Sequence, residues 1–458
     1  MEATIKNYLL LLLLLLFVTA GCKKLVQVDA PDSPVTAETV FANDSLAQQA
    51  VTGLYIKIMT NTKYLLNAGT TVFPGLSADE LVRTTPLASE DQFYTVSLQN
   101  NNQLILNNTW KPAYNYIYQC NICINGLEKS TKVTALLKTR LTGEVKFVRA
   151  LCYFYLVNFF GDVPLALSTN ADVNAALARS PVNKVYDQIV NDLLSASELL
   201  TDENENTLPS KLAALALLAR VYLYQQQWQK AGAASASVIN SGKLALPTDL
   251  ATVFKSSSKE IIFQWAPVLF GYNSIEGALF IPVSPTAAPG YIINAGLVNA
   301  FETNDSRKAN WVGSATIGAQ TYYYPYKYRV RTSAVATEYN VVLRLAEQYL
   351  IRAEASAKQD HIADAITDLN LIRARAGLPD LSTNSTLEEC LAYIEQERRV
   401  ELFAEWGHRW LDLKRTQRAD AVLSSVKGSS WSVNDWLYPI PVSEIEMAPN
   451  LIQNPGYE

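Results

Sequence analysis

The chain contains few of the residues from which metal and redox sites are built. Its 458 residues include only 2 histidines and 5 cysteines. Neither His361 nor His408 has a second ligand at the spacing that a zinc site requires. The net charge is only -5 and the sequence has no cluster of basic residues, which argues against a nucleic-acid partner. We therefore expect no metal, no cofactor and no nucleic acid.

The chain also lacks an apolar run long enough to cross a bilayer. The longest run, from Tyr8 to Val18, would form a helix that reaches roughly half of the ~30 Å hydrocarbon core. A lysine before this run and small residues after it are typical of a secretory signal. The stretch up to Cys22 resembles a bacterial lipoprotein signal, which predicts a signal peptide over 1–21 and acylation of Cys22. An ordinary secretory signal followed by an incidental cysteine is the alternative.

Helical periodicity dominates from about residue 43 onward. The segments 213–239 and 344–379 repeat one scheme, in which small residues let two antiparallel helices approach closely, as in tetratricopeptide-type repeats. The segment 147–160 is apolar nearly all round and stops at Gly161, so we expect a buried helix with a glycine C-cap. These patterns predict an all-α dominated fold of tetratricopeptide-like helix pairs.

Two regions interrupt this periodicity. Residues 244–340 are rich in Gly, Pro, Ser, Thr and aromatic residues, and a second loop-like stretch covers 76–103. We expect long irregular loops with a few short strands here, and loops of this length are usually functional. The predicted organisation is therefore a tether over 22–42, a helical half over 43–243, a loop-rich ligand-binding insertion over 244–340, and a second helical half over 341–458.

Several polar or reactive residues admit a catalytic interpretation. Glu397 and Glu401, one turn apart, could serve as the acid and base of a glycosidase. Neighbouring arginines favour an ion-pair lattice instead. Arg149 lies in an apolar helix, and we expect it to pair with a carboxylate of the Glu-rich segment 394–415. The structural pairs that we predict are Glu395 with Arg399, Arg398 with Glu401, and Glu405 with Arg409.

Cys120 and Cys123 form a C-x-x-C motif, which occurs in redox and zinc sites. The surrounding sequence, "YNYIYQCNICINGL", is typical of a buried helix. We therefore predict that both cysteines are small core residues.

The blocks at 144–165, 340–357, 369–379, 394–415 and 436–458 together resemble the SusD/RagB family. The resemblance implies a right-handed superhelical body over 43–458, with an irregular ligand-binding surface. It also implies a lipid-anchored nutrient-binding protein of the outer membrane, facing the extracellular side. Such a protein captures an oligosaccharide or another nutrient and delivers it to a SusC-like TonB-dependent outer-membrane transporter, without catalysis. Asp305 and Arg307 match a short family stretch that pins a loop.

The aromatic residues of the loops are the better candidates for ligand contact. Sugar rings have apolar faces and polar rims, and they bind to aromatic side chains that have polar groups around them. The alternative for Trp265 is a strand residue that packs on the core. The candidate ligand-binding residues are Asp79, Arg83, Phe93, Trp265, Tyr272, Tyr291, Trp311, Tyr322 and Tyr324.

Two other functions remain open at this stage. A non-ligand-binding envelope adaptor would use the tetratricopeptide-like helices for protein contact. A surface glycoside hydrolase would use the carboxylates of 394–415.

Overall fold

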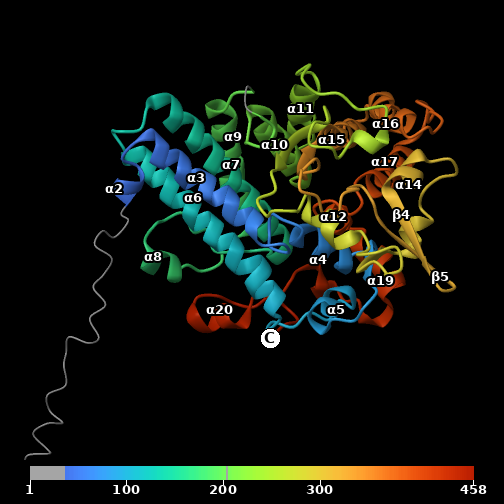
Figure 1. Cartoon of the computed structure of the whole chain (residues 1–458), viewed down its shortest axis with the longest axis horizontal. Helices are drawn as coiled ribbons and strands as arrows, with labels where there is room; N and C mark the ends of the chain where they lie inside the picture. Colours follow the sequence, from blue (N-terminus) through green and yellow to red (C-terminus); the bar gives the residue numbers. More distant parts are fainter. Residues whose placement is uncertain (1–36, 203–204) are drawn as a thin grey trace, which may run out of the picture.

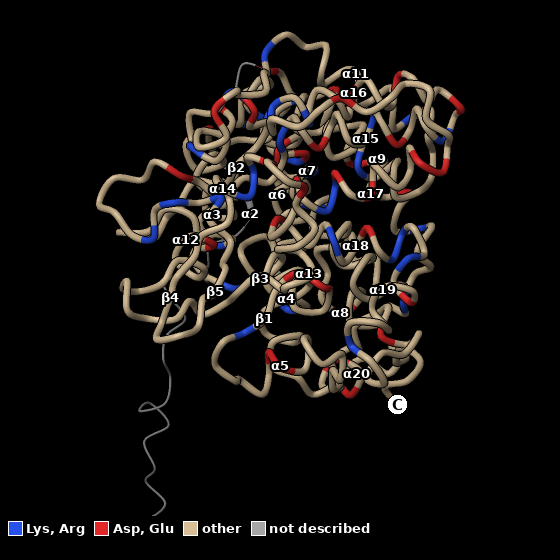
Figure 2. Tube along the Cα trace, turned by 90° about the vertical axis from the view of Figure 1, so that its right-hand side faces the viewer, with Lys and Arg blue, Asp and Glu red and all other residues tan. Residues whose placement is uncertain are grey.

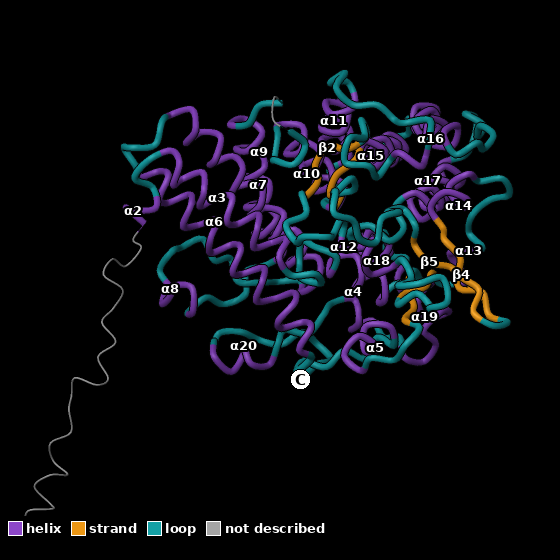
Figure 3. Tube along the Cα trace, in the orientation of Figure 1, coloured by secondary structure: helices purple, strands orange, loops and turns teal. Residues whose placement is uncertain are grey.

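The computed structural model describes residues 37–202 and 205–458. The predicted signal peptide, Cys22 and most of the predicted tether lie outside the described residues. Helices dominate, as the periodicity predicts, and the strands are short (Figure 3). Within the described ranges, no helix has both the length and the apolar character needed to cross a membrane.

The first half of the chain is almost entirely helical. Its helices are α2 (Ala37–Val40), α3 (Asp44–Thr60), α4 (Gly69–Ser77), α5 (Ala88–Tyr94), α6 (Lys111–Lys129), α7 (Ala135–Phe160), α8 (Ala171–Ala175), α9 (Val182–Leu199), α10 (Lys211–Tyr224) and α11 (Trp228–Ile239). The helices of the second half are α12 (Ile275–Phe280), α13 (Ala295–Val298), α14 (Ser306–Trp311), α15 (Leu345–Ala357), α16 (Ile362–Arg375), α17 (Leu387–Glu401), α18 (His408–Arg415), α19 (Ala419–Lys427) and α20 (Val442–Met447).

The two helix pairs predicted from small residues are confirmed, and they stack on each other. Helices α10 and α11 form one antiparallel pair, α15 and α16 form the other, and α11 packs directly against α15 (Figure 1). A Cβ built at Gly232 on α11 would lie 3.6 Å from the Cβ of Ala355 on α15. Small residues at this contact therefore permit the close approach of segments that are more than 100 positions apart in the chain.

Helix α7 is the predicted buried helix. Its residues from Phe147 to Phe160 are buried except for Asn158, and the helix ends at Gly161. Gly161 has φ +72°, a conformation that favours glycine, and an added Cβ there would lie 2.9 Å from Leu437. The C-cap glycine is thus required both by the backbone and by the packing of the C-terminal segment.

Arg149 on α7 has a buried carboxylate partner, but not the predicted one. Its Nε and Nη2 donate to Asp192 at 2.8 and 2.7 Å, and its Nη1 donates to Asn121 Oδ1 at 2.8 Å. The prediction of a partner in the Glu-rich segment is wrong, because α9, which carries Asp192, packs along α7.

The cysteines of the C-x-x-C motif face the core from α6, as predicted. Cys120 and Cys123 are free and buried, as are Cys152 and Cys390. Burial raises the pKa of the Cys123 thiol to about 12, so the group stays protonated and has no thiolate character at neutral pH.

Within the described residues, the strands form three separate two-stranded antiparallel sheets. β1 (Leu81–Arg83) pairs with β3 (Tyr291–Ile293), β2 (Ile261–Trp265) pairs with β6 (Asn340–Arg344), and β4 (Val312–Ile317) pairs with β5 (Gln320–Pro325). In register, Leu81 lies opposite Ile293, and Val312 lies opposite Pro325. The two regions predicted as loops are therefore tied together by β1 and β3, and the stretch 76–103 also contains the short helix α5.

Candidate ligand-binding surface

Most of the residues predicted to contact a ligand are buried in the structure. A side chain without accessible surface has no face to offer a ligand in this conformation. The buried members of the predicted set are Asp79, Phe93, Trp265, Tyr291, Trp311 and Tyr324.

The two tryptophans of this set have clear packing partners. Trp265, at the end of β2, packs edge-on against Phe263 with ring centroids 4.6 Å apart, in agreement with the alternative of a core strand residue. Trp311 donates from Nε1 to the carbonyl of Leu250 at 3.0 Å, and the ammonium of Lys327 lies 4.9 Å from its ring centroid. Both rings belong to the core beneath the loops.

Asp79 and Arg83 are held in ion pairs. Asp79 accepts from Arg409 Nε at 2.7 Å and from Arg399 Nη2 at 2.8 Å. Burial alone would raise the pKa of Asp79, but the two arginines outweigh burial and hold the pKa below its ordinary value. Arg83 donates to Glu90 Oε2 at 2.6 Å, and the Tyr291 hydroxyl donates to the same oxygen at 2.6 Å. These contacts fasten β1 and α5 to β3.

Accessible aromatic side chains nevertheless occur in the same loops. Of the predicted residues, Tyr272 is 36% exposed and Tyr322 is half-buried. The ring of Phe270 is 90% exposed and that of Tyr323 is 41% exposed. Phe270 was absent from the predicted ligand set, although its position beside Gly271 in a Gly- and Pro-rich segment is a signal that could have identified it.

These four residues lie on a surface that we call the loop rim, formed by residues 266–290 and 312–339. Its two segments are joined by backbone and side-chain hydrogen bonds. Ser333 N donates to Gly271 O at 2.9 Å, and Arg331 Nη1 donates to Ile281 O at 3.0 Å. Asn273 Oδ1 accepts from the backbone amides of Thr337 and Glu338 at 2.6 and 2.9 Å. Phe270 and Tyr272 therefore project from a braced segment, whereas Tyr322 and Tyr323 lie on the β4–β5 hairpin.

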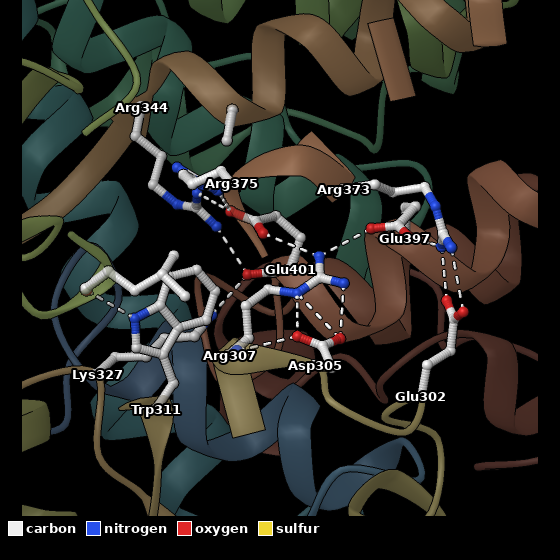
Figure 4. Close-up of polar contacts among 12 residues, drawn as sticks. Glu302, Asp305, Arg307, Trp311, Lys327, Arg344, Arg373, Arg375, Glu397 and Glu401 are labelled. Atoms are coloured by element: carbon white, nitrogen blue, oxygen red, sulfur yellow. Dashed lines mark hydrogen bonds and ion pairs between the residues drawn. The ribbon is translucent and has the colours of Figure 1, made fainter. Parts of the chain in front are cut away.

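The Glu-rich segment is part of a largely buried ion-pair core, and Figure 4 labels most of its members. Two carboxylates of α17 lie at its centre, and arginines from three other segments surround them. The ion-pair core consists of Glu260, Glu302, Asp305, Arg307, Lys327, Arg344, Arg373, Arg375, Glu397, Glu401 and Glu405.

The carboxylate of Glu401 is saturated with cationic donors. Arg344 Nη1 lies 2.6 Å from Oε1 and Arg307 Nη1 lies 3.1 Å from Oε2, and Arg375 also binds Oε1 (Figure 4). Burial would raise the pKa of Glu401, but the charges of Arg375, Arg344 and Arg307 hold it well below its ordinary value. A carboxylate that is buried, ionised and fully paired is a poor general acid, and no open face remains for a substrate.

The ion-pair lattice is confirmed in kind, but its predicted pairs are wrong. Arg398, Arg399 and Arg409 reach across to other elements instead of to carboxylates one turn away, whereas Arg415 pairs with Asp412 on its own helix at 2.7 Å. Arg398 pairs with Asp412 at 2.7 Å, Arg399 with Asp79 at 2.8 Å, Arg409 with Asp79 at 2.7 Å, and Glu405 with Arg344 at 2.7 Å. Figure 2 shows acidic and basic positions interspersed around α15 and α17.

Asp305 and Arg307 hold the start of α14 in place, as the resemblance implies. Asp305 caps the helix by accepting from Arg307 N at 2.9 Å, and its other oxygen pairs with Arg307 Nη2 at 2.8 Å. Arg307 also reaches Glu397 at 2.8 Å, so the ion-pair core fixes the chain that leads into β4 and the loop rim.

The histidines lie apart from any ligand cluster. His361 is the exposed N-cap residue of α16, whereas His408 is buried. Burial and the nearby Arg220 push the pKa of His408 well below its ordinary value, so this imidazole is neutral. Within the described part of the chain, no three His, Cys, Asp or Glu side chains are grouped so as to hold a metal ion.

Comparisons with known proteins match both halves of the chain. A family model described as starch-binding and associating with the outer membrane matches residues 35–223, and the model of the SusD family matches residues 294–457. A SusD-like protein of Formosa agariphila is 25% identical to this chain in an alignment of 523 positions, gaps included. The alignment covers 97% of this chain and 98% of that protein.

Solved structures show the same fold. A SusD superfamily protein from Bacteroides vulgatus superimposes with a TM-score of 0.81 at 21% identity, covering 91% of this chain and 100% of that one. A laminarin-binding SusD-like protein superimposes with a TM-score of 0.77 at 24% identity, with coverages of 91% and 100%.

Proposed function

Because the chain belongs to the SusD/RagB family, we propose that it is a carbohydrate-binding protein of the outer membrane. It captures an oligosaccharide on the loop rim and delivers it to a SusC-like TonB-dependent outer-membrane transporter. Acylation of Cys22 anchors it, with the body on the extracellular side. It binds its ligand without cleaving it.

The observation that carries this proposal is the exposure of aromatic rings on a braced frame. Phe270 and Tyr323 leave apolar ring surface open to water, and Tyr272 adds a ring with a polar edge. Such rings bind the C–H faces of sugars, while the surrounding polar groups bind the hydroxyls. The matched family model describes starch binding, and one structural neighbour binds laminarin. Both polymers are neutral glucans, so neutral glucan oligosaccharides are the ligands to test first.

The non-catalytic part of the proposal is supported by the state of the acidic residues. Glu397 and Glu401, the pair that a glycoside hydrolase would use, are buried and bound by arginines. Incubation with laminarin and starch, followed by a reducing-sugar assay, should give no turnover. Turnover that disappears in Glu401→Gln with the fold intact would overturn this part of the proposal.

The binding site is tested by affinity electrophoresis of the full chain in gels that contain laminarin or starch. The ring of Phe270 should contribute about 1–2 kcal/mol through stacking and burial, so Phe270→Ala should weaken binding by roughly tenfold. The matched control is Leu136→Ala, which removes an exposed apolar side chain on α7, far from the loop rim in sequence. If both variants bind as the wild type does, the loop rim is not the ligand site.

The anchor and the partner need separate experiments. Cys22→Ser removes the only acylation site that we propose, so the protein should leave the membrane fraction. Copurification of the wild-type protein from solubilised outer membranes should recover a transporter barrel. Recovery of secretion proteins alone would instead favour the envelope adaptor that the helix pairs also allow.

A further inference from the structure

A surface around α8 leaves large apolar side chains open to solvent. It includes α8 itself, the loop that precedes it, part of α6, and the tail that follows α20. We call this surface the α8 face. Its exposed apolar residues are Tyr118, Leu167, Val173, Met447 and Ile452.

The parts of the α8 face lie side by side. Tyr118 on α6, Asn174 on α8 and Met447 on α20 line one groove of about 620 Å³. The tail is fastened beside α8, because Asn450 Nδ2 donates to Ala176 O at 2.8 Å. Three segments that are far apart in the chain therefore form one surface.

The α8 face holds few charges. Segments 165–178 and 447–457 contain a single charged residue, Asp172, whereas charged residues make up 18% of the whole chain. Lys111 and Glu444, which also line the groove, are paired with each other at 4.0 Å. Lys, Glu, Arg and Asp dominate surfaces that stay in water. An exposed patch that is apolar and almost uncharged indicates contact with an apolar medium or partner.

Helix α8 supports the same conclusion. It has only five residues, Ala171–Ala175, and none of them is buried by the described part of the chain. The Asn170 side chain caps the helix by accepting from Asp172 N at 2.9 Å, but an isolated helix of this length is unstable in water and depends on packing. The contact that stabilises α8 is therefore expected from outside the described residues.

The composition of the α8 face favours lipid over protein as this partner. Trp, Tyr and Arg contribute most of the binding energy at protein interfaces, whereas Leu and Val are under-represented among such residues. Of the five exposed apolar residues, Tyr118 is the only aromatic one. Surfaces that lie in the membrane interface bury apolar side chains at the boundary of head groups and acyl chains, and tyrosine is enriched at the level of the head groups.

The position of the predicted anchor favours the same partner. Phe41, directly after α2, packs against Gly126 of α6, and Tyr118 lies two turns earlier on that helix, about 12 Å along its axis. Ala37 follows Cys22 by 15 positions, so the chain between them spans at most about 50 Å. An acylated Cys22 therefore keeps the α8 face near the bilayer. Figure 1 shows α2 and α8 at one end of the molecule, and β4 and β5 of the loop rim at the opposite end.

We propose that the α8 face rests on the bilayer to which the protein is anchored, with Val173, Met447 and Ile452 at the boundary between head groups and acyl chains. This contact rests on the proposed acylation of Cys22, because a few apolar side chains alone hold a protein on a membrane only weakly. The contact orients the molecule, so that the loop rim at the opposite end faces away from the membrane and toward saccharides in the medium.

The test compares the depth of two labels in vesicles of phosphatidylcholine and phosphatidylglycerol that carry the acylated protein. Val173→Cys and Val335→Cys each receive a thiol-reactive nitrobenzoxadiazole label, and Val335 is an exposed valine of the loop rim. The four cysteines of the described chain are buried, so the label attaches at the introduced residue. A lipid that carries a nitroxide should quench the label at position 173 roughly threefold more strongly than the label at position 335.

A second pair of substitutions tests the contact itself. Ile452→Asp places a charge on the α8 face and Val283→Asp places one on the loop rim, and the two replaced side chains are 72% and 70% exposed. Ile452→Asp should reduce the quenching at position 173 by about half, because a carboxylate resists transfer from water to an apolar boundary. Val283→Asp should leave the quenching unchanged, and both variants should keep the circular dichroism of the wild type.

Flotation of the vesicles separates this proposal from the proposed anchor. If the wild-type protein does not float with the vesicles, the acylation of Cys22 is wrong and this contact fails with it. If the protein floats but the two labels are quenched equally, or if Ile452→Asp has no effect, the anchor stands and the lipid contact is wrong. Shielding of position 173 that occurs in native outer membranes but not in lipid vesicles would assign the α8 face to a protein partner and overturn the proposal.

Discussion

The ion-pair core and the loop rim lie in the same half of the chain and use their side chains in opposite ways. In the ion-pair core every carboxylate of α17 that points inward is bound by cations from other segments. In the loop rim the buried polar groups brace the backbone, and aromatic rings remain open to water. The comparison shows that a dense charge cluster can be scaffold, while a segment with irregular backbone carries exposed aromatic rings.

The two regions are also connected. Arg307, at the centre of the ion-pair core, starts the helix that leads into β4. Lys327, just after β5, donates to the carbonyl of Glu401 at 2.7 Å and binds Glu405. Burial lowers the pKa of Lys327 to about 8. The ion-pair core therefore fixes both ends of the β4–β5 hairpin, so damage to it should be transmitted to the loop rim.

The largest effect should come from removing a central charge. Glu401→Gln leaves Arg344, Arg375 and Arg307 with less negative charge in a buried site, and it should lower the free energy of unfolding by about 3–5 kcal/mol. The measurement is urea unfolding followed by circular dichroism. Glu395→Gln, on the same helix but partly exposed, should cost less than about 1 kcal/mol. Equal losses in the two variants would contradict the distinction between core and surface pairs.

A smaller effect, which depends on pH, should arise where the loop rim meets the core. Glu276 on α12 accepts from Asn340 Nδ2 at 2.7 Å, and its other oxygen has no partner among the described residues. Burial raises the pKa of Glu276 from 4.5 to about 7. The stability that this group contributes is therefore fully present below pH 4.5 and is lost as the pH rises through 7.

Glu276→Gln should remove this loss, because an amide does not ionise. The variant should match the wild type at pH 4 and should be more stable by up to about 3 kcal/mol at pH 8, as measured by urea unfolding. Glu446→Gln, an exposed substitution on α20, should leave the pH dependence unchanged. A Glu276→Gln variant that is equally or less stable at pH 8 would show that the buried carboxylate is compensated by other contacts.

The smallest expected effect concerns the exposed rings. Tyr323→Ala should lower glucan affinity several-fold, equivalent to about 1 kcal/mol of lost ring contact, and should change the free energy of unfolding by less than about 0.5 kcal/mol. Tyr118 on α6 is a matched control, because it is 40% exposed against 41% for Tyr323. Tyr118→Ala should leave glucan affinity unchanged. A loss of stability in Tyr323→Ala would assign this ring to the scaffold.

The helical scaffold was largely predictable from the sequence because helical periodicity is local. The apolar run that stops at Gly161 predicted a buried helix. The small residues of 213–239 and 344–379 predicted helices that pack closely in pairs. The partners of individual charges were not predictable in the same way. Arg399 pairs with Asp79, which lies 320 positions away, and a long arginine side chain can reach another element as easily as its own next turn.

The proposed ligand surface was less predictable for a related reason. Phe93 and Trp311 lie in segments without helical periodicity, and such segments give no pattern from which the buried face can be read. In the structure both rings fill the core beneath the loops, whereas Phe270 and Tyr323 project outward. Which ring is buried depends on contacts such as that of Trp311 with Leu250, which are set by the tertiary fold.

In the loop rim, the groups that hold the backbone in place differ from the aromatic rings that are exposed on the surface. Asn273 joins the two segments by accepting from the backbone amides of Thr337 and Glu338, and the Glu338 carboxylate accepts from Arg329 N within the second segment. None of these contacts involves the outward-facing rings. Under the proposed function, a substitution at position 270, 272 or 323 should change which sugar is recognised while the backbone beneath it keeps its course. If the loop rim binds sugars as proposed, single residue changes there should alter specificity without a matching change in the scaffold.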